Sequence, residues 1–448
     1  MKMFSTPSRR FGDRSSRLLG VVLPALFAFS STGLPQDLDG DSIAVIERGT
    51  PTVDGWDIAE FPFKVITAPL YLLALGGEWA ANAAQQAHLL PWAYYLNSEL
   101  NQRSLYPTVA SLGSGSGTGA ALLIGIPGRP TSPWGYVRGG ATFKGYWRIT
   151  ARAGYGLEAV APGGAHAFGT HAFGWIEDRP EDEYYGIGND SQEDDRSNYQ
   201  LKRATVGATL GFAATRDIAI TIDLDWSRSE AGPGKNPTLP SVDSIFGPVE
   251  IPGFGDLDRY LSFGGSAEWR NGYRGLLPGG RWLRLGLSWN ESYSDGAADF
   301  AQIEAAAGAD IPFDHERRSL TLALLYQTVR PSGAGEISFY RLPTLGGSST
   351  LPAYRTGRFR DRDLILGRAE YSYRIWLNPT YTSALVASIF LYGGMVAEDL
   401  WDEFAFDQLW PSYGIALATR STGGSGARLE FAGGKEGLRV NFTFLVGF

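Results

Sequence analysis

Apolar and polar residues alternate over long stretches of this chain, and this period of two constrains the fold more than any other feature. In residues 218–227 every second residue is apolar, and two aspartates lie among the residues between. Residues 364–376 and 438–448 repeat the pattern, with arginine, glutamate and asparagine on the polar side. Successive side chains of a β-strand point to opposite faces, so the pattern predicts strands with one apolar and one polar face.

Composition narrows the class of protein that such strands can form. No stretch reaches the roughly 18 consecutive apolar residues that a membrane-spanning helix needs. With 44% hydrophobic and 19% charged residues, the chain is expected to fold rather than remain disordered. The remaining classes are a soluble β-rich protein and a membrane β-barrel. The absence of cysteine excludes disulfides, thiolate nucleophiles and cysteine-bound zinc.

Residues 1–33 have the three parts of an export signal. A basic region precedes an apolar core, Leu18 to Phe29, and small residues follow it from Ser30 to Gly33. We therefore expect cleavage near this point and a location in the outer membrane of a Gram-negative cell. Removal of the signal shifts the net charge from −8 to about −12, so nucleic acid is not expected as a partner.

Residues 34–103 do not alternate as strands do. The apolar run 61–75 is interrupted by prolines, and an alanine-rich helical pattern follows at 78–90. A helix on the membrane face or in a barrel mouth and an ordinary buried helix are both compatible with this pattern. We expect residues 34–103 to form a short helical segment in the periplasm or a plug.

Residues 104–448 are expected to form sixteen antiparallel strands. The longest connections, 177–197, 229–258 and 331–362, all follow odd-numbered strands, and those after even-numbered strands are often tight. Short turns at one end and long loops at the other are typical of outer-membrane barrels. The predicted fold class is all-β: a sixteen-stranded antiparallel transmembrane β-barrel, closed so that no strand edge is free.

No motif in the chain indicates an enzyme, a metal site or a cofactor. The glycine-rich run 113–119 lacks the order of a catalytic elbow or a phosphate loop. The four histidines, His88, His166, His171 and His315, have no metal-ligand spacing. The nine acidic residues of 177–197 are interpreted as a solvated surface loop.

Residues 342–374 read LPTLGGSSTLPAYRTGRFRDRDLILGRAEYSYR. This stretch resembles the sixth-loop region of the BamA/TamA family of outer-membrane proteins, the bacterial surface antigen superfamily, whose pattern runs roughly LGG…LRGY…GRFRD…LLG..EYR. Weaker similarity lies at 184–191 (YYGIGNDS) and at 60–62. The chain resembles a short member of the family, without the periplasmic POTRA modules that its assembly factors carry.

The resemblance implies a candidate site in this loop. In the family, a loop arginine pairs with an acid on the thirteenth strand, but Pro352 and Tyr392 occupy those positions here. We expect the loop to enter the lumen, with its arginines pairing to inward acids such as Glu370, Asp223 or Asp225. The candidate residues are Gly346, Gly347, Tyr354, Arg355, Gly357, Arg358, Phe359, Arg360 and Asp361, with Arg362 as a further cation and Glu370 as lumen partner.

The family resemblance favours a barrel that assists insertion or export of proteins across the outer membrane. Its physical basis would be a weak seam where glycines of the first strand meet the last strand, formed by Gly113, Gly115, Gly117, Gly119 and Phe448. The alternative is a pore or lipid and small-solute transporter plugged by its N-terminal segment and sixth loop. Expected partners are outer-membrane lipids and lipopolysaccharide, client proteins or a periplasmic protein, with the chain itself a monomer.

Overall fold

The computed structural model describes residues 104–445 except 111, 113–114, 127–131, 159, 162–166, 248–250, 274–278, 314–316, 334, 379–382 and 422–425. The expected signal peptide, 1–33, and the expected helical segment, 34–103, therefore lie outside the described residues. Gly113 and Phe448 of the predicted seam lie outside them too.

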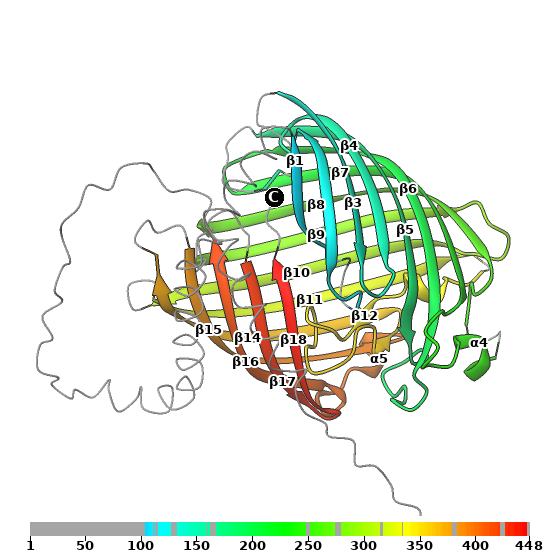
Figure 1. Ribbon diagram of the computed structural model, residues 1–448. Helices are drawn as coiled ribbons and strands as arrows, with labels where there is room; N and C mark the ends of the chain where they lie inside the picture. The colour runs from blue at the N-terminus through cyan, green and yellow to red at the C-terminus, as the bar shows by residue number, and fades with distance from the viewer. Residues whose placement is uncertain are drawn as a thin grey trace, which may run out of the picture.

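Sixteen strands form one antiparallel sheet, and each strand pairs with the neighbour that precedes or follows it in the sheet (Figure 1). They are β1 (Leu105–Ala110), β2 (Gly119–Ile126), β3 (Pro133–Thr142), β4 (Trp147–Gly156), β5 (Phe168–Tyr184), β6 (Ser197–Ala213), β7 (Ile218–Pro233), β8 (Leu257–Tyr273), β9 (Gly279–Ser292), β10 (Asp299–Phe313), β11 (Arg318–Ser332), β14 (Asp363–Leu377), β15 (Ser383–Ala397), β16 (Trp410–Ser421), β17 (Gly426–Gly434) and β18 (Gly437–Leu445).

The remaining elements lie in connections. They are α4 (Val242–Ile245), the 3-10 turn η2 (Phe339–Arg341), the small hairpin of β12 (Thr344–Leu345) and β13 (Phe359–Arg360), α5 (Leu400–Glu403) and the 3-10 turn η3 (Phe406–Gln408). None of the helices in the described part of the chain has the length and hydropathy of a membrane span.

The sheet is inverted relative to a soluble protein, because its apolar faces are exposed and its charges point inward. On β7, Ile222, Leu224 and Trp226 are 39%, 50% and 40% exposed. Asp223 and Asp225 alternate with them on the concave side, called the lumen here. Exposed apolar side chains on the convex side and polar ones in the lumen are the pattern of a membrane barrel.

The predicted arrangement of connections is confirmed. The connections after β5, β7 and β11 are long, as is the one after β15, and all four lie at one end of the sheet. At the other end, β6 and β7 are joined by residues 214–217 only.

The acidic stretch 177–197 differs from the expected solvated loop. Strand β5 continues through Tyr184, and Glu177 is only 3% exposed on it. The Glu177 carboxylate accepts hydrogen bonds from Arg148 over 2.8 Å and from Arg203 over 2.7 Å. For the acids on β5 the prediction was wrong, because arginines on the neighbouring strands β4 and β6 allow a carboxylate to lie on the inner wall. In the connection 185–196, Asp190, Glu193 and Asp194 are exposed as expected.

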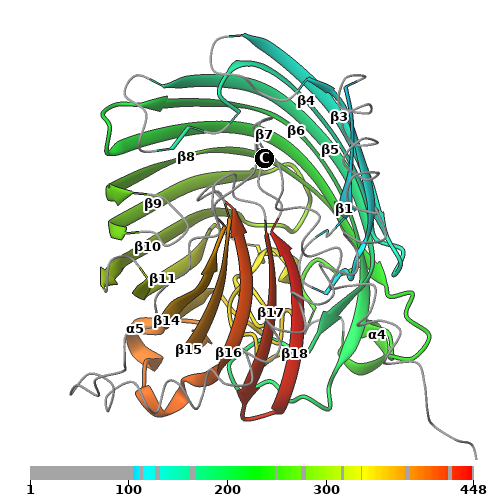
Figure 2. The same ribbon diagram turned by 60° about the vertical axis from the view of Figure 1, so that its left-hand side comes forward.

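The sheet curls until its two ends, β1 and β18, approach the same side of the molecule (Figure 2). Within the described residues, β1 pairs only with β2 and β18 only with β17. The expected closure by pairing of the first and last strands is therefore not found there. Strand β1 is six residues long, whereas β5 and β6 have 17 each.

Candidate functional site

The connection between β11 and β14, residues 333–362, lies in the lumen against β14 to β17. Figure 2 shows it, in yellow, on the concave side of the sheet behind β16 to β18. One buried apolar cluster joins loop and wall. It comprises Leu345, Leu351, Ala353, Tyr354 and Phe359 from the loop and Leu364, Leu366, Phe390, Tyr392, Val396, Ala416 and Ala432 from the strands.

Arg358 is the most deeply buried charge of this loop, at 2% exposure. Its Nε donates to Glu436 Oε1 over 2.6 Å, in the turn between β17 and β18. Its two terminal nitrogens donate to the hydroxyl and the carbonyl of Ser191, over 2.8 and 2.7 Å. Burial outweighs the nearby guanidinium and raises the pKa of Glu436. Arg358 therefore joins three connections that are far apart in sequence.

Arg360 is held by aromatic rings and backbone rather than by an acid. Its guanidinium lies 5.6 Å from the ring of Tyr184, 5.9 Å from that of Tyr199 and 5.3 Å from that of Phe339. Its Nη1 donates to the Phe339 carbonyl over 2.7 Å. Its own carbonyl accepts from the Gly188 N–H over 2.8 Å. This contact and the Arg358–Ser191 contact join the loop to 184–191, the stretch that also carried family similarity.

The other two loop arginines pair outside the expected set of acids. Arg355 lies 3.8 Å from Glu183, at the end of β5. Arg362 lies 2.7 Å from Glu398, a pair in which both side chains are largely exposed. The expected pairing of loop arginines with Glu370, Asp223 or Asp225 is thus replaced by pairing with Glu183, Glu398 and Glu436. Glu183, Glu398 and Glu436 all lie near the end of the sheet at which the loop leaves β11.

Glu370 pairs with the barrel wall instead of with the loop. Both of its oxygens accept from Arg428 of β17, over 2.8 and 3.2 Å, and Tyr392 donates to it over 2.6 Å. Tyr392 stands where the resembled family has an acid, and here its hydroxyl donates to the carboxylate of Glu370 on β14. Pro352, at the position of the family's loop arginine, accepts at its carbonyl from Asn441 of β18 over 2.8 Å.

Three loop glycines have backbone conformations that other residues rarely adopt. Gly346 has φ +111°, and a Cβ there would lie 2.0 Å from the Arg355 carbonyl oxygen. Gly357 has φ +66°. Gly347, with φ +86°, donates to the Tyr354 carbonyl over 2.9 Å and so closes the loop on itself. The close turn explains why the glycine pair stands at this point of the sequence.

Tyr354 and Asp361 complete the predicted loop residues. The Tyr354 hydroxyl donates to the Pro411 carbonyl over 2.8 Å and accepts from the Lys435 N–H over 3.0 Å. Asp361 is 7% exposed, and burial raises its pKa to about 6. Its carboxylate accepts from the Arg362 N–H over 2.8 Å.

The predicted seam glycines that the structure describes, Gly115, Gly117 and Gly119, do not lie on an edge strand. Gly115 and Gly117 lie in the connection between β1 and β2, with φ +86° and +73°. Gly119 begins β2 and pairs with both Ala110 and Thr142. The edge strand β1 instead contains Pro107, which has no N–H to donate. Proline within a sheet is confined largely to edge strands. Pro107, rather than a glycine, is therefore the residue that indicates an edge strand here.

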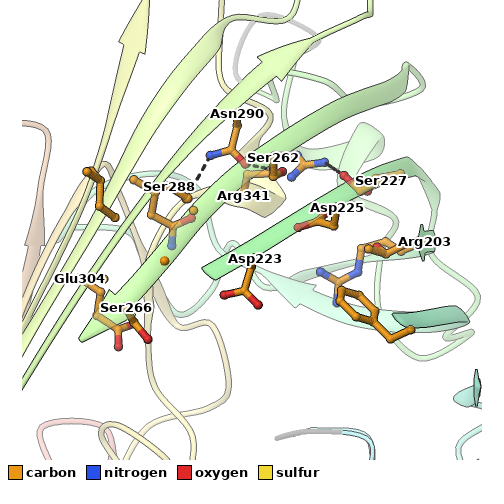
Figure 3. Close-up of a pocket in the computed structure, with 18 of the residues that line it drawn as sticks. Arg203, Asp223, Asp225, Ser227, Ser262, Ser266, Ser288, Asn290, Glu304 and Arg341 are labelled. Atoms are coloured by element: carbon orange, nitrogen blue, oxygen red, sulfur yellow. Dashed lines mark hydrogen bonds between the residues drawn. The ribbon is translucent and has the colours of Figure 1, made fainter. Parts of the chain in front are cut away.

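A second candidate site is a cavity of about 490 Å³ in the lumen wall between β5 and β10 (Figure 3). Short side chains on β8 and β9 leave it open, and η2 of the loop covers it with Arg341. Arg341 donates to the Ser227 hydroxyl over 3.3 Å, and its guanidinium lies 4.1 Å from the Tyr260 ring. Hydroxyl and amide groups line it: Thr205, Ser227, Ser229, Ser262, Ser266, Ser288, Asn290 and Gln302.

Sequence reasoning missed Glu436 and Ser191 as partners of the loop. Glu436 carries no local signal, because a two-residue turn is common anywhere. Ser191 ends the stretch 184–191 that resembles the family, but nothing in that stretch indicates a contact with the loop. In the described residues, no group of His, Asp and Glu side chains is arranged to hold a metal ion.

These features define a class: an all-β chain whose sixteen-stranded antiparallel sheet resembles outer-membrane barrels. No family model and no curated protein matches the chain. Among solved structures it is similar to BamA from Haemophilus ducreyi lacking POTRA domains 1–3, with 14% identity, a TM-score of 0.52, and coverage of 79% of this chain and 77% of that one. It also matches CdiB from Escherichia coli at 13% identity and TM-score 0.49, over 76% of this chain and 61% of that one.

The similarity to BamA is a similarity of fold, because 14% identity is too low to indicate a shared function.

Proposed function

We propose that this chain is an outer-membrane barrel that assists the insertion or export of proteins by pairing client strands at the seam between β1 and β18. The observation that carries the proposal is the sheet order, which begins at β1 and ends at β18 with no pairing between them in the described residues. Unpaired N–H and C=O groups in hydrocarbon cost several kcal/mol each. Such edges are stable only when another strand satisfies them, and a client strand is one source of that pairing.

The lengths of the edge strands support this proposal. Strand β1 pairs with β2 over six residue pairs, whereas β5 and β6 pair along most of their 17 residues. Pro107 removes one donor from β1. A short edge strand has few backbone hydrogen bonds to lose. Replacing its present pairing by pairing with a client strand therefore costs less free energy than it would for a long strand. The lumen loop packs on β14 to β17, so we expect opening on the β1 side of the seam.

A photo-crosslinking experiment tests the proposal. A photoreactive amino acid in place of Tyr106 on β1 should capture nascent outer-membrane proteins in cells. The same amino acid in place of Leu285 serves as a matched control, because Leu285 is 49% exposed on the convex side of β9, far from the seam. Equal capture at both positions, or capture at neither while outer-membrane proteins are being made, would contradict the proposal.

The lumen cavity favours a second candidate function, passage of a small polar solute. Its lining combines acids from β7 and β10 with Arg203, Arg284 and Arg341 and with several hydroxyls. Such a surface replaces the hydration shell of a hydroxyl-rich solute. Ion conductance of planar bilayers separates the two functions. Removal of residues 335–341, which include the η2 cover, should raise conductance severalfold if the cavity is part of a path, and leave it unchanged if the loop only braces the wall.

A further inference from the structure

The connection between β15 and β16, residues 398–409, turns outward and folds onto the convex side of the sheet. It contains α5 and η3, and we call it the outer loop. Leu400 and Leu409 of this loop pack with Met395 and Ala397 at the end of β15. Figure 2 places α5 outside β14 and β15, on the opposite side of the sheet from the lumen loop.

The strand register shows that the residues under this loop belong to the outer face. Leu391 is 59% exposed on the convex side of β15, and Met395 and Ala397, four and six residues further along the strand, lie on the same face. Across the ladders, Met395 lies opposite Ile365, which lies opposite Tyr326. Met395 and Ala397 are nevertheless 0% and 1% exposed. The outer loop therefore covers wall residues that would otherwise face lipid.

The aromatic side chains of the outer loop point away from this contact. Trp401 is 83% exposed and Phe406 is 81% exposed, among the highest values for large apolar residues in the described chain. Phe404 is 40% exposed and lies edge-on to Phe406, with ring centroids 5.0 Å apart. Exposure of a tryptophan and two phenylalanines together in one short loop is costly in water and marks a surface that another phase or molecule covers.

Polar contacts hold the loop against the wall. The Leu400 N–H donates to Asp363 Oδ2 over 2.9 Å, and Asp363, fully buried, pairs with Arg330 of β11 over 2.6 Å. Asp399 caps α5 by accepting from the Trp401 N–H over 3.0 Å. The position of the aromatics is thus fixed relative to the end of the sheet.

We propose that the outer loop is a lipid-contact surface that inserts Trp401 and Phe406 into the interfacial region of the bilayer leaflet at this end of the barrel. The inference rests on the membrane placement proposed above. Continuity favours lipid over a protein partner, because the loop lies on the lipid-facing wall directly beyond Leu391 and Tyr413, which is 55% exposed. Tryptophan prefers the interface to the hydrocarbon, and the flanking acids Asp402, Glu403 and Asp407 set a limit to deeper insertion.

The absence of cysteine makes a site-specific test simple. The variants Trp401→Cys and Phe406→Cys are labelled with a nitroxide in the full chain, reconstituted in vesicles of phosphatidylcholine and phosphatidylglycerol, and probed by collision with oxygen and with a water-soluble nickel chelate. Leu391→Cys, on the wall, is the lipid control. Asp194→Cys, in the exposed connection between β5 and β6, is the aqueous control. Retained heat-modifiable migration shows that each variant is folded.

Labels at 401 and 406 should collide with the nickel chelate severalfold less often than the label at 194. The ratio of oxygen to chelate collisions should place them at a shallower depth in the bilayer than the label at 391. Collision equal to that at 194, with 391 in lipid, would overturn the lipid-contact proposal and leave the barrel's placement intact. A label at 391 exposed to the chelate would instead contradict the membrane placement. Spin–spin broadening at 401 that disappears on dilution with unlabelled chain would assign the surface to a second copy and also overturn the proposal.

Discussion

Arg358 of the lumen loop and Glu436 of the β17–β18 turn form an ion pair with Nε and Oε1 2.6 Å apart, in which the arginine side chain is 2% and the glutamate side chain 13% exposed. The two residues stand in place of the pair that the family resemblance implied, which Pro352 and Tyr392 do not form. This ion pair ties the loop to the turn between β17 and β18, at the end of the sheet. The pair implied by the resemblance would have tied it to Tyr392's position within β15.

Loss of one partner of this pair should loosen the loop strongly. Arg358→Met leaves Glu436 without its cation, and truncation of one member of a buried pair costs about 3–5 kcal/mol. The unfolding free energy in urea, measured on protein folded in lipid vesicles, checks this value. Arg362→Met is the matched control, because the Arg362–Glu398 pair has side chains 41% and 69% exposed and should contribute under about 1 kcal/mol. Equal losses in the two variants would contradict the assignment.

Gly346→Ala should destabilise the loop by at least about 2 kcal/mol, since the left-handed backbone alone costs about 1–2 kcal/mol and a Cβ would meet the Arg355 carbonyl at 2.0 Å. Faster cleavage within 335–358 by a protease, with an unchanged strand signal in circular dichroism, is the expected result. Gly232→Ala, where a Cβ would have nothing within 4 Å, should leave the cleavage rate unchanged. A resistant Gly346→Ala loop would show that the glycine is not required there.

Asp361 should make the loop more stable in mild acid. Its pKa is raised to about 6 by burial, with Glu403 and Glu398 acting in the same direction and Arg362 against them. The folded chain then holds a proton that an unfolded aspartate, with a pKa of about 3.9, has released. The stabilisation is fully present below about pH 4 and is lost as pH rises through about 6.

Asp361→Asn should therefore flatten the fall in unfolding free energy between pH 4 and 6, because the amide oxygen still accepts from the Arg362 N–H. Unfolding in urea at several pH values measures the slope. Asp407→Asn, at an exposed position of the outer loop, should keep the wild-type slope. If Asp361→Asn keeps that slope as well, the pH dependence arises elsewhere.

Much of the fold follows from the sequence, because a period of two and turn lengths are local properties. The sixteen strands, their order and the end that carries the long connections were predictable in this way. The end of β5 was not, because the acids from Glu177 onward suggest a solvated loop unless Arg148 and Arg203 are known to flank them.

The loop's partners were not predictable for a related reason. Arg358, Ser191 and Glu436 meet only after the sheet has curled, and an arginine accepts any acid or carbonyl within reach. The glycines of 115–119 were misplaced because the same residues suit a weak strand and a tight turn.

A reversible crosslink between the first and last strands tests the proposed seam most directly. Tyr106→Cys is combined in turn with Arg439→Cys, Asn441→Cys or Thr443→Cys, and the pair is joined by oxidation or a short bismaleimide. Insertion of a newly made barrel protein into vesicles containing the variant is measured. Leu285→Cys with Ala305→Cys, opposite each other on β9 and β10, is the control crosslink. The account predicts loss of insertion on joining β1 to β18, recovery when a disulfide is reduced, and no effect in the control. Full insertion activity with β1 joined to β18 would contradict it.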